Sequence, residues 1–323
     1  MTVKTTIQAL NQVFFQAMER DPEVIVMGED VGVDGGVFRI TDGLVAKFPE
    51  RVFDTPLAEA GIIGTAIGLS VYGFKPICEI QFSGFIYPAF QEIVSHLARL
   101  RNRSRGRFSA HMVIRAPHFG GVRALEHHSE GTEAYYVHTP GLKVVIPSNP
   151  YDAKGLMASA IEDPDPVIFL EPLKLYRLKA EVPDEYYTVP LGKANVIAEG
   201  NDVTIVTYGT MVKLCQNVAE EFKEKNTTIE VIDLRSLNPL DWKTIEGSVK
   251  KTGRLVVVHE APRTCGLGAE ISALAGERLM TDLKAPVVRV TGYDTIMPFY
   301  KMENWFIPDE KRIREGIEKV LMF

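Results

Sequence analysis

The chain has 323 residues, a length that suits two domains of ordinary size rather than one. Apolar residues make up 46% and charged residues 24%, which is typical of a folded globular protein and excludes a disordered one. The net charge of −6 argues against nucleic acid or an anionic membrane as the main partner.

The first half of the chain alternates short β-branched runs with amphipathic stretches. Buried strands are predicted over 24–27, 76–80, 112–115, 144–147 and 167–170. Helices are predicted between them over 5–19, 59–72, 86–101 and 151–162. This alternation is typical of an open parallel sheet with helices on both faces, an α/β fold.

After Glu171 the alternation stops, and Pro- and Tyr-containing sequence through about Val189 predicts a linker. A second α/β series follows, with strands near 203–208, 229–234, 254–259 and 286–291 and a helix at the C-terminus. We therefore expect two open parallel-sheet α/β domains, over residues 1–185 and 186–323.

The sequence also predicts a location and excludes some cofactors. No run approaches the roughly 18 apolar residues of a membrane span, and Met1 to Lys4 lack the apolar core of a signal peptide, so a cytoplasmic protein is expected. Cys78, Cys215 and Cys265 are widely spaced and form no C-x-x-C pair, which argues against disulfides, zinc sites and iron–sulfur clusters.

One carboxylate, Glu59, lies in an otherwise apolar and glycine-rich segment at the start of a predicted helix. Apolar neighbours remove water from a carboxyl group and favour its neutral form, which suits proton transfer. A first-turn Glu that interacts with the helix dipole is the more frequent situation, and on its own Glu59 would be assigned that role.

The helix predicted over 59–72 contains three glycines, Gly61, Gly64 and Gly68. Each costs about 1 kcal/mol relative to alanine in a helix interior, so some packing advantage is expected in return. Gly64 and Gly68 share one face, where another backbone can approach closely. The spacing leaves open whether that face packs on the chain's own sheet or on another subunit.

Several motifs keep a common order and spacing along nearly the whole chain. They are Val-Met-Gly-Glu-Asp-Val-Gly at 26–32, Gly-Gly-Val-Phe-Arg at 35–39, Arg-Val-Phe-Asp-Thr-Pro-Leu-Ala-Glu at 51–59, and further segments at 79–82, 140–147, 231–235 and 251–254. Together they resemble the β subunit of thiamine-diphosphate-dependent 2-oxo acid dehydrogenases, the decarboxylase component. The resemblance implies a pyrimidine-type thiamine-diphosphate-binding fold followed by a transketolase C-terminal-like domain, and an intersubunit contact for the glycine face.

The resemblance also implies roles for single residues. Glu59 matches the catalytic Glu that hydrogen-bonds the aminopyrimidine ring of the cofactor, Phe85 the aromatic that stacks on this ring, and Leu57 belongs with them as a cofactor-binding residue. Glu29, which follows strand 24–27 at the edge where ligands of open α/β folds bind, matches a Glu that supports Glu59. His128 matches the active-site histidine that binds the substrate carboxylate or assists acyl transfer to lipoyl.

A metal site is implied by the same resemblance. Residues Ala160, Ile161, Asp163 and Asp165 resemble a loop that binds potassium, mainly through backbone oxygens, in some relatives. Backbone ligands leave little trace in a sequence, so the side chains themselves add little to this expectation.

A motif that the family requires does not occur in this chain. The family holds the diphosphate of the cofactor through Mg²⁺, using a Gly-Asp-Gly segment followed by Asn, and no Gly-Asp-Gly occurs here. Nor is there a P-loop or a G-x-G-x-x-G motif. The chain is therefore expected to supply half an active site, and an α subunit, in a heterotetramer of two α and two β chains, to supply Mg²⁺ and the diphosphate site.

The segments at 128–138, 169–172, 259–262 and 289–294 look more like branched-chain than pyruvate enzymes. The expected reaction is oxidative decarboxylation of a branched-chain 2-oxo acid and reductive acylation of the lipoyl group of an acyltransferase core. A pyruvate or acetoin dehydrogenase β subunit is the alternative, because the acyl pocket would be lined largely by the α chain.

Three other classes are less consistent with the sequence. A single-chain transketolase or deoxyxylulose-phosphate synthase needs the Gly-Asp-Gly half on the same polypeptide. A ferredoxin-linked 2-oxo acid oxidoreductase needs clustered thiolates. A noncatalytic scaffold subunit that only binds the acyltransferase core would have no need for Glu59, Phe85 and His128 together.

Overall fold

The first sheet has seven strands in the order β12-β6-β7-β5-β4-β2-β3 in the computed structural model, which describes residues 1–323. All neighbouring strands run parallel except β12, which pairs antiparallel with β6. The bounds are β2 Val24–Gly28, β3 Val52–Asp54, β4 Lys75–Glu79, β5 Val113–His118, β6 Lys143–Val145, β7 Val167–Pro172 and β12 Ser236–Asn238.

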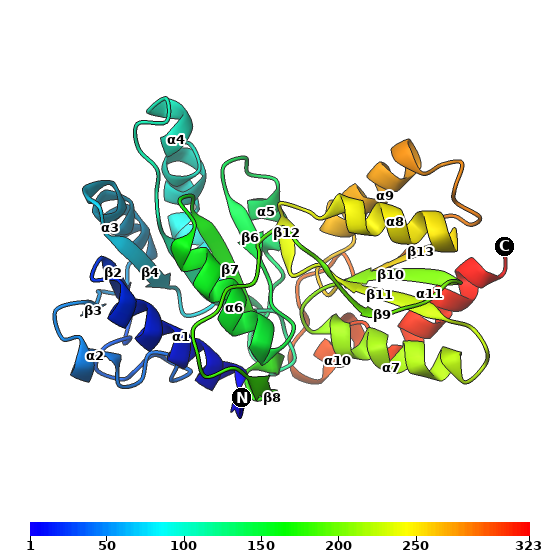
Figure 1. Ribbon diagram of the computed structural model, residues 1–323, viewed down its shortest axis with the longest axis horizontal. Helices are drawn as coiled ribbons and strands as arrows, with labels where there is room; N and C mark the ends of the chain where they lie inside the picture. Colours follow the sequence, from blue (N-terminus) through cyan, green and yellow to red (C-terminus); the bar gives the residue numbers. More distant parts are fainter.

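Helices cover both faces of this sheet, as the alternating pattern predicts (Figure 1). Helices α1 (Thr6–Arg20) and α6 (Pro150–Glu162) pack together with the face of β2 that carries Val24 and Val26. Helix α3 (Glu59–Tyr72) lies against the opposite face. Both helices on the first face begin at a side-chain cap, Thr5 for α1 and Asn149 for α6, which fixes where each helix starts.

The helix predicted over 86–101 is wrong in detail. The segment folds as a 3₁₀ helix at Ser83–Ala89, a π-helical turn at Glu92–Leu97 and the short α-helix α4 at Leu100–Arg103. Pro88 lies inside the first piece, where it removes a backbone donor and prevents a regular α-helix. The apolar periodicity of the segment is real, but it does not show this interruption.

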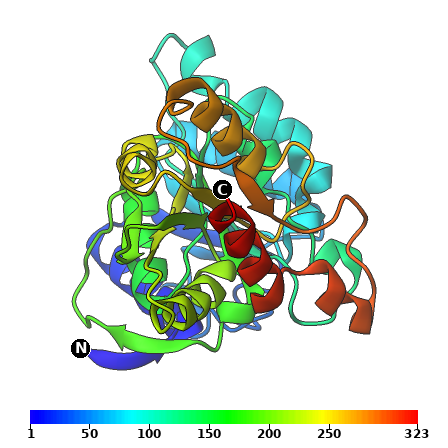
Figure 2. The same ribbon diagram turned by 90° about the vertical axis from the view of Figure 1, so that its right-hand side faces the viewer.

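The second sheet has five strands in the order β14-β13-β10-β11-β9, parallel except for β9. Its strands are β9 Asn195–Ala198, β10 Val203–Thr207, β11 Ile229–Asp233, β13 Leu255–Val258 and β14 Val288–Val290. Helices α8 (Trp242–Thr252) and α9 (Leu267–Arg278) lie on one face, and α7 (Met211–Lys223) and α11 (Glu310–Leu321) on the other (Figures 1 and 2). The two-sheet α/β fold expected from the sequence is thus confirmed.

The segment predicted as a linker is bound to the first half of the molecule. It contains strand β8 (Lys179–Val182), which pairs antiparallel with β1 (Thr2–Thr5). The ammonium group of Lys154, on α6, donates hydrogen bonds to the carbonyl oxygens of Pro183 and Glu185 at 2.7 and 2.8 Å. This stretch is therefore a covered edge of the first domain rather than a free spacer.

One apolar core joins the two halves. It extends from the α3 face of the first sheet, through Ile146 and Leu170, to the α8–α9 face of the second sheet, where Tyr208 and Val257 belong to the same cluster. None of the helices has the length and apolar composition that a membrane span requires.

Candidate active site

Two carboxylates meet where β2 ends and α3 begins. Glu29 directly follows β2 and is 6% exposed, while Glu59 is the first residue of α3 and is half-buried. Burial raises the pKa of Glu29 above its ordinary value, and the neighbouring carboxylates of Glu59, Asp30 and Glu79 raise it further. The structure therefore brings the two predicted acids together.

This arrangement corrects one detail of the sequence analysis. Pro56, Leu57 and Ala58, which were expected to shield Glu59 from water, are exposed, and the Leu57 side chain is 80% exposed. Within this chain the carboxyl group withdrawn from water is that of Glu29. The apolar residues beside Glu59 face outward, where they form part of the molecular surface.

Three rings pack together on segments that follow β4 and β5, at the same edge of the sheet where β2 ends. The imidazole of His128 lies 4.3 Å from the ring centroid of Phe82 and 5.0 Å from that of Phe85, and the two Phe rings are 5.5 Å apart. Phe85 belongs to the 3₁₀ helix Ser83–Ala89, which contacts α3. His128 belongs to a 3₁₀ turn at Glu126–His128, which contacts the Ser83–Ala89 helix. Phe82, which no motif marks as a site residue, also contacts His128.

Two buried polar atoms of this cluster have no hydrogen-bond partner in the protein, Oε1 of Glu29 and Nδ1 of His128. Buried polar groups almost always find partners, so these two atoms are available to bind a polar molecule. A carboxyl pair beside aromatic rings can stack a flat heteroaromatic ring and exchange a proton with one of its nitrogens.

The turn that carries His128 is seated directly on the Phe85 helix. A side chain at Gly84 would come within 2.3 Å of the His127 carbonyl oxygen, so only glycine allows the two backbones to approach this closely. Ser83 donates to the carbonyl oxygen of Glu130 at 3.3 Å, and the Tyr87 hydroxyl donates to the Glu130 carboxylate at 2.9 Å. These contacts fix the downstream side of His128.

A buried ionic network behind the site was not anticipated from the sequence. The guanidinium of Arg115 on β5 donates two 2.6 Å hydrogen bonds to Glu171 and another bond to Glu79, and the Tyr176 hydroxyl donates to Glu171 at 2.6 Å. Glu79 is the last residue of β4 and Glu171 the last but one of β7, the two strands that flank β5, and all three side chains are buried. The sequence shows only isolated ionisable residues in mainly apolar strands, and this does not reveal which of them pair.

The residues of the proposed potassium loop lie at the end of α6. Ala160 and Ile161 are buried in its last turn, the Asp163 carboxylate accepts from Lys143 at 2.7 Å, and Asp165 accepts from Arg101 at 2.6 Å. Both carboxylates are thus engaged by basic side chains, which leaves the unpaired carbonyl groups of the helix end as ligands. The potassium site stays a prediction.

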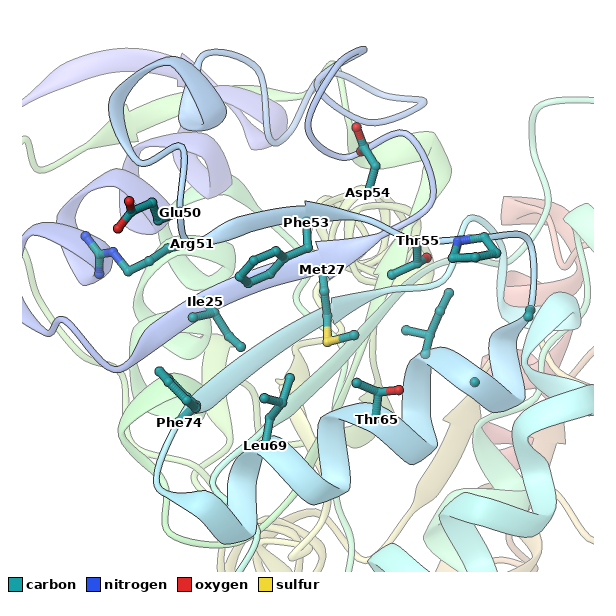
Figure 3. A pocket seen from close by; sticks show the side chains of 14 residues that line it. Ile25, Met27, Glu50, Arg51, Phe53, Asp54, Thr55, Thr65, Leu69 and Phe74 are labelled. Atoms are coloured by element: carbon teal, nitrogen blue, oxygen red, sulfur yellow. The ribbon is translucent and has the colours of Figure 1, made fainter.

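An apolar groove of about 580 Å³ runs between the edge strand β3 and α3 (Figure 3). Phe53 and Met27 face Thr65 and Leu69 across it, and Ala58 and Gly61 line it near the start of α3. The cluster of Glu59, Phe85 and His128 lies outside this groove. We therefore assign the groove to packing rather than to the reaction.

The glycine face of α3 is exposed next to this groove. A Cβ atom at Gly68 would meet no atom within 4 Å, and one at Gly64 would meet only Glu92, at 4.0 Å. These glycines therefore do not pack on the chain's own sheet, which removes one of the two alternatives left open by their spacing.

Comparisons with known proteins agree with this architecture. The family model "Transketolase, pyrimidine binding domain" matches residues 3–179, and "Transketolase, C-terminal domain" matches residues 192–313. Among solved structures, "Split gene transketolase, inactive beta4 tetramer" superposes with a TM-score of 0.81 at 23% identity over 98% of both chains. A transketolase from Pichia stipitis gives 0.70 at 15% identity, over all of this chain and 46% of that one.

Relatives with higher identity cover the whole chain. "Pyruvate dehydrogenase E1 component subunit beta" of Acholeplasma laidlawii is 49% identical over 322 residues, which are 99% of this chain and 98% of the relative. The protein of the same name from Staphylococcus epidermidis is 50% identical over the full length of both chains. The chain belongs to the E1 β subunits of 2-oxo acid dehydrogenases, which are enzyme subunits with transketolase pyrimidine-binding and C-terminal domain folds.

Proposed function

We propose that this chain is the β subunit of a pyruvate dehydrogenase E1 component and forms the pyrimidine side of a thiamine diphosphate site. The observations that support the proposal are the pairing of Glu29 with Glu59, the ring contact between Phe85 and His128, and the unpartnered buried atoms on Glu29 and His128. The four segments that carry these residues follow β2, β3, β4 and β5 at one edge of the first sheet.

The residues present fit the pyrimidine ring of this cofactor. Phe85 offers an aromatic face for stacking, and Glu59 a carboxyl group able to donate to a ring nitrogen. Thiamine diphosphate, when bound, supplies the carbanion-stabilising chemistry that decarboxylation requires. The chain's own contribution is to orient that ring and to hold one proton at Glu59, with Glu29 close behind it.

His128 is proposed to act on the substrate. Its imidazole packs against the rings of Phe82 and Phe85, and its Nδ1 is buried without a protein partner. Such a nitrogen can bind the carboxylate of a 2-oxo acid or help to pass the acyl group to a lipoyl group. Leu57, exposed beside Glu59, is proposed to contact the cofactor once a second chain closes over it.

An α subunit is proposed to complete the site. No Gly-Asp-Gly segment is present here, so Mg²⁺ and the diphosphate need ligands from elsewhere. The exposed glycine face of α3 and the adjoining groove are an apolar surface without a partner in this chain, as expected for a contact between subunits. A heterotetramer of two α and two β chains that acylates a lipoyl acyltransferase core follows from this interpretation.

Pyruvate is the proposed substrate. The relatives described above are all named pyruvate dehydrogenase subunits and give no support to the branched-chain preference expected from the motifs. A pyruvate dehydrogenase β subunit, the alternative given in the sequence analysis, therefore fits better.

The test is reconstitution with the α chain of the same organism that carries Gly-Asp-Gly. We expect kcat/KM for pyruvate to exceed that for a branched-chain 2-oxo acid by at least tenfold, about 1.4 kcal/mol in the barrier. The β chain alone should show no turnover with thiamine diphosphate and Mg²⁺. Turnover by the β chain alone would contradict the shared site, and preference for the branched acid would restore the first expectation.

A further inference from the structure

The loop that leads to His128 is held by two carboxylates from the other half of the molecule. Glu260 accepts a hydrogen bond from the backbone N–H of Gly120 at 2.7 Å. Glu303 accepts from the N–H of Gly121 at 2.6 Å and, with its second oxygen, from the N–H of Arg123 at 2.9 Å. We call Glu260 and Glu303 the carboxylate clamp.

No other interaction explains why the Glu303 side chain is buried. Its side chain is 1% exposed, no basic side chain forms an ion pair with it, and it lies at the first position of α10 (Glu303–Phe306). A buried carboxylate without a cation is costly unless hydrogen bonds stabilise its charge. Here both oxygens are used on main-chain amides of one loop, and such charge-assisted bonds are about twice as strong as neutral ones.

The loop needs such restraint because its backbone is strained. Phe119 and Arg123 have φ values of 66° and 59°, in the left-handed region that residues with a Cβ atom disfavour. Such conformations cost of order 1 kcal/mol or more each and persist only where neighbouring contacts enforce them. The carboxylate clamp binds the backbone N–H groups of Gly120, Gly121 and Arg123, which all lie in this strained stretch.

The carboxylate clamp is close enough to His128 to set its position. Only four residues lie between Arg123, whose N–H is anchored, and His128, and the downstream side is held by Ser83 and Tyr87 through Glu130. If the upstream anchor were lost, this stretch could move by several ångströms, since each residue spans up to about 3.5 Å. The ring contacts of His128 with Phe82 and Phe85 would then loosen.

We propose that Glu303, assisted by Glu260, is a positioning residue that fixes His128 in the active site through the backbone of loop 119–129. The proposal rests on the proposed function, in which His128 acts on the substrate. It assigns to the C-terminal domain a direct part in ordering the catalytic loop of the first domain.

The first measurement is amide hydrogen exchange of the assembled α–β enzyme, followed in peptides that cover residues 119–129. Glu303→Ala should raise exchange in this loop at least tenfold, and Glu303→Gln, which retains one accepting oxygen and the same volume, should give an intermediate rate. The matched control is Glu315→Gln, whose carboxylate is 60% exposed and faces only Lys311. Unchanged exchange in both Glu303 variants would overturn the proposal.

The second measurement is a double-mutant cycle with His128. If Glu303 acts through His128, Glu303→Ala should lower kcat about tenfold in the wild-type background and should cause no further loss in the His128→Ala background. Independent, multiplying losses would overturn the positioning role. Full activity of His128→Ala would refute the proposed role of His128, and with it any effect of the carboxylate clamp on catalysis. The exchange rates would still show whether the clamp orders the loop.

Discussion

The sequence attributes two properties, contact with the cofactor and burial, to Glu59. In the structure the buried acid is Glu29. The motif around Glu59 indicates which acid faces the cofactor, but burial depends on which chains pack around it. In this chain Glu29 is the buried acid, and Glu59 lies at the open start of α3. A carboxyl group that faces a ligand and touches a buried neighbour can exchange protons without being buried itself.

At this scale the decisive variant is Glu59→Gln, which keeps the shape of the side chain but cannot deliver a proton. We expect folding and assembly with the α chain to be retained, and proton exchange at the thiazolium carbon of the cofactor to slow by on the order of 10² or more. The measurement is hydrogen–deuterium exchange at that carbon, with Phe85→Ala beside it as a variant that should weaken cofactor orientation only. Wild-type exchange in the Gln variant would leave Glu59 as an ordinary first-turn carboxylate.

Several site residues could be found from the sequence and others could not. Glu29, Glu59, Phe85 and His128 were selected because motifs mark them, and the structure pairs Glu29 with Glu59 and Phe85 with His128. Arg115 and Glu171 were missed because single charges at strand ends give no periodic signal, and their pairing depends on strand order. Glu303 was missed because it is distant in sequence from the loop that it holds.

Among the elements, α3 departs most from ordinary helix design. Its glycines lower the stability of the helix, yet their face is exposed and no contact within the chain explains them.

The regular strands and helices were predicted well because their apolar period is strong. Strands β1, β3, β8, β9 and β12 were missed, because each has only three or four residues and includes exposed or half-buried polar ones, so it forms no run of buried apolar residues.

The glycine face can be tested by Gly68→Leu. No atom lies within 4 Å of the added Cβ, so the isolated chain should fold with unchanged or slightly higher stability, because leucine favours a helix by up to about 1 kcal/mol over glycine. Assembly with the α chain should nevertheless fail, as seen by light scattering. The matched control is Gly247→Leu in α8, another open helical position, which should assemble normally. Normal assembly of Gly68→Leu would remove α3 from the subunit contact.

Across the whole molecule, buried acids at the junction of the two halves make stability depend on pH. Asp233 ends β11 and accepts hydrogen bonds from the Ser148 hydroxyl and from the backbone N–H of Arg235. Burial raises its pKa to about 7, although the hydrogen bond from Ser148 lowers the pKa and so opposes this shift. The folded state then retains a proton that the unfolded chain releases near pH 4, so stability falls as pH rises from about 4 to about 7.

Asp233→Asn should remove this dependence while keeping the shape of the side chain. We expect the variant to match the wild type near pH 5 and to be more stable near pH 8 by about 3 kcal/mol, because the wild type loses stability over roughly two pH units between about pH 5 and about pH 7. Urea unfolding of the isolated chain at both pH values provides the measurement. A difference between the two proteins that does not change with pH would show that Asp233 titrates normally.

The short strand β12 affects where the gene of this chain could be split into two parts. Residues 236–238 follow β11 of the second sheet, yet they complete the edge of the first sheet beside β6. A gene split between the two family domains would leave one product without its edge strand and the other with an unpaired strand. Exchange of either half between related genes therefore has to preserve the match between β6 and β12.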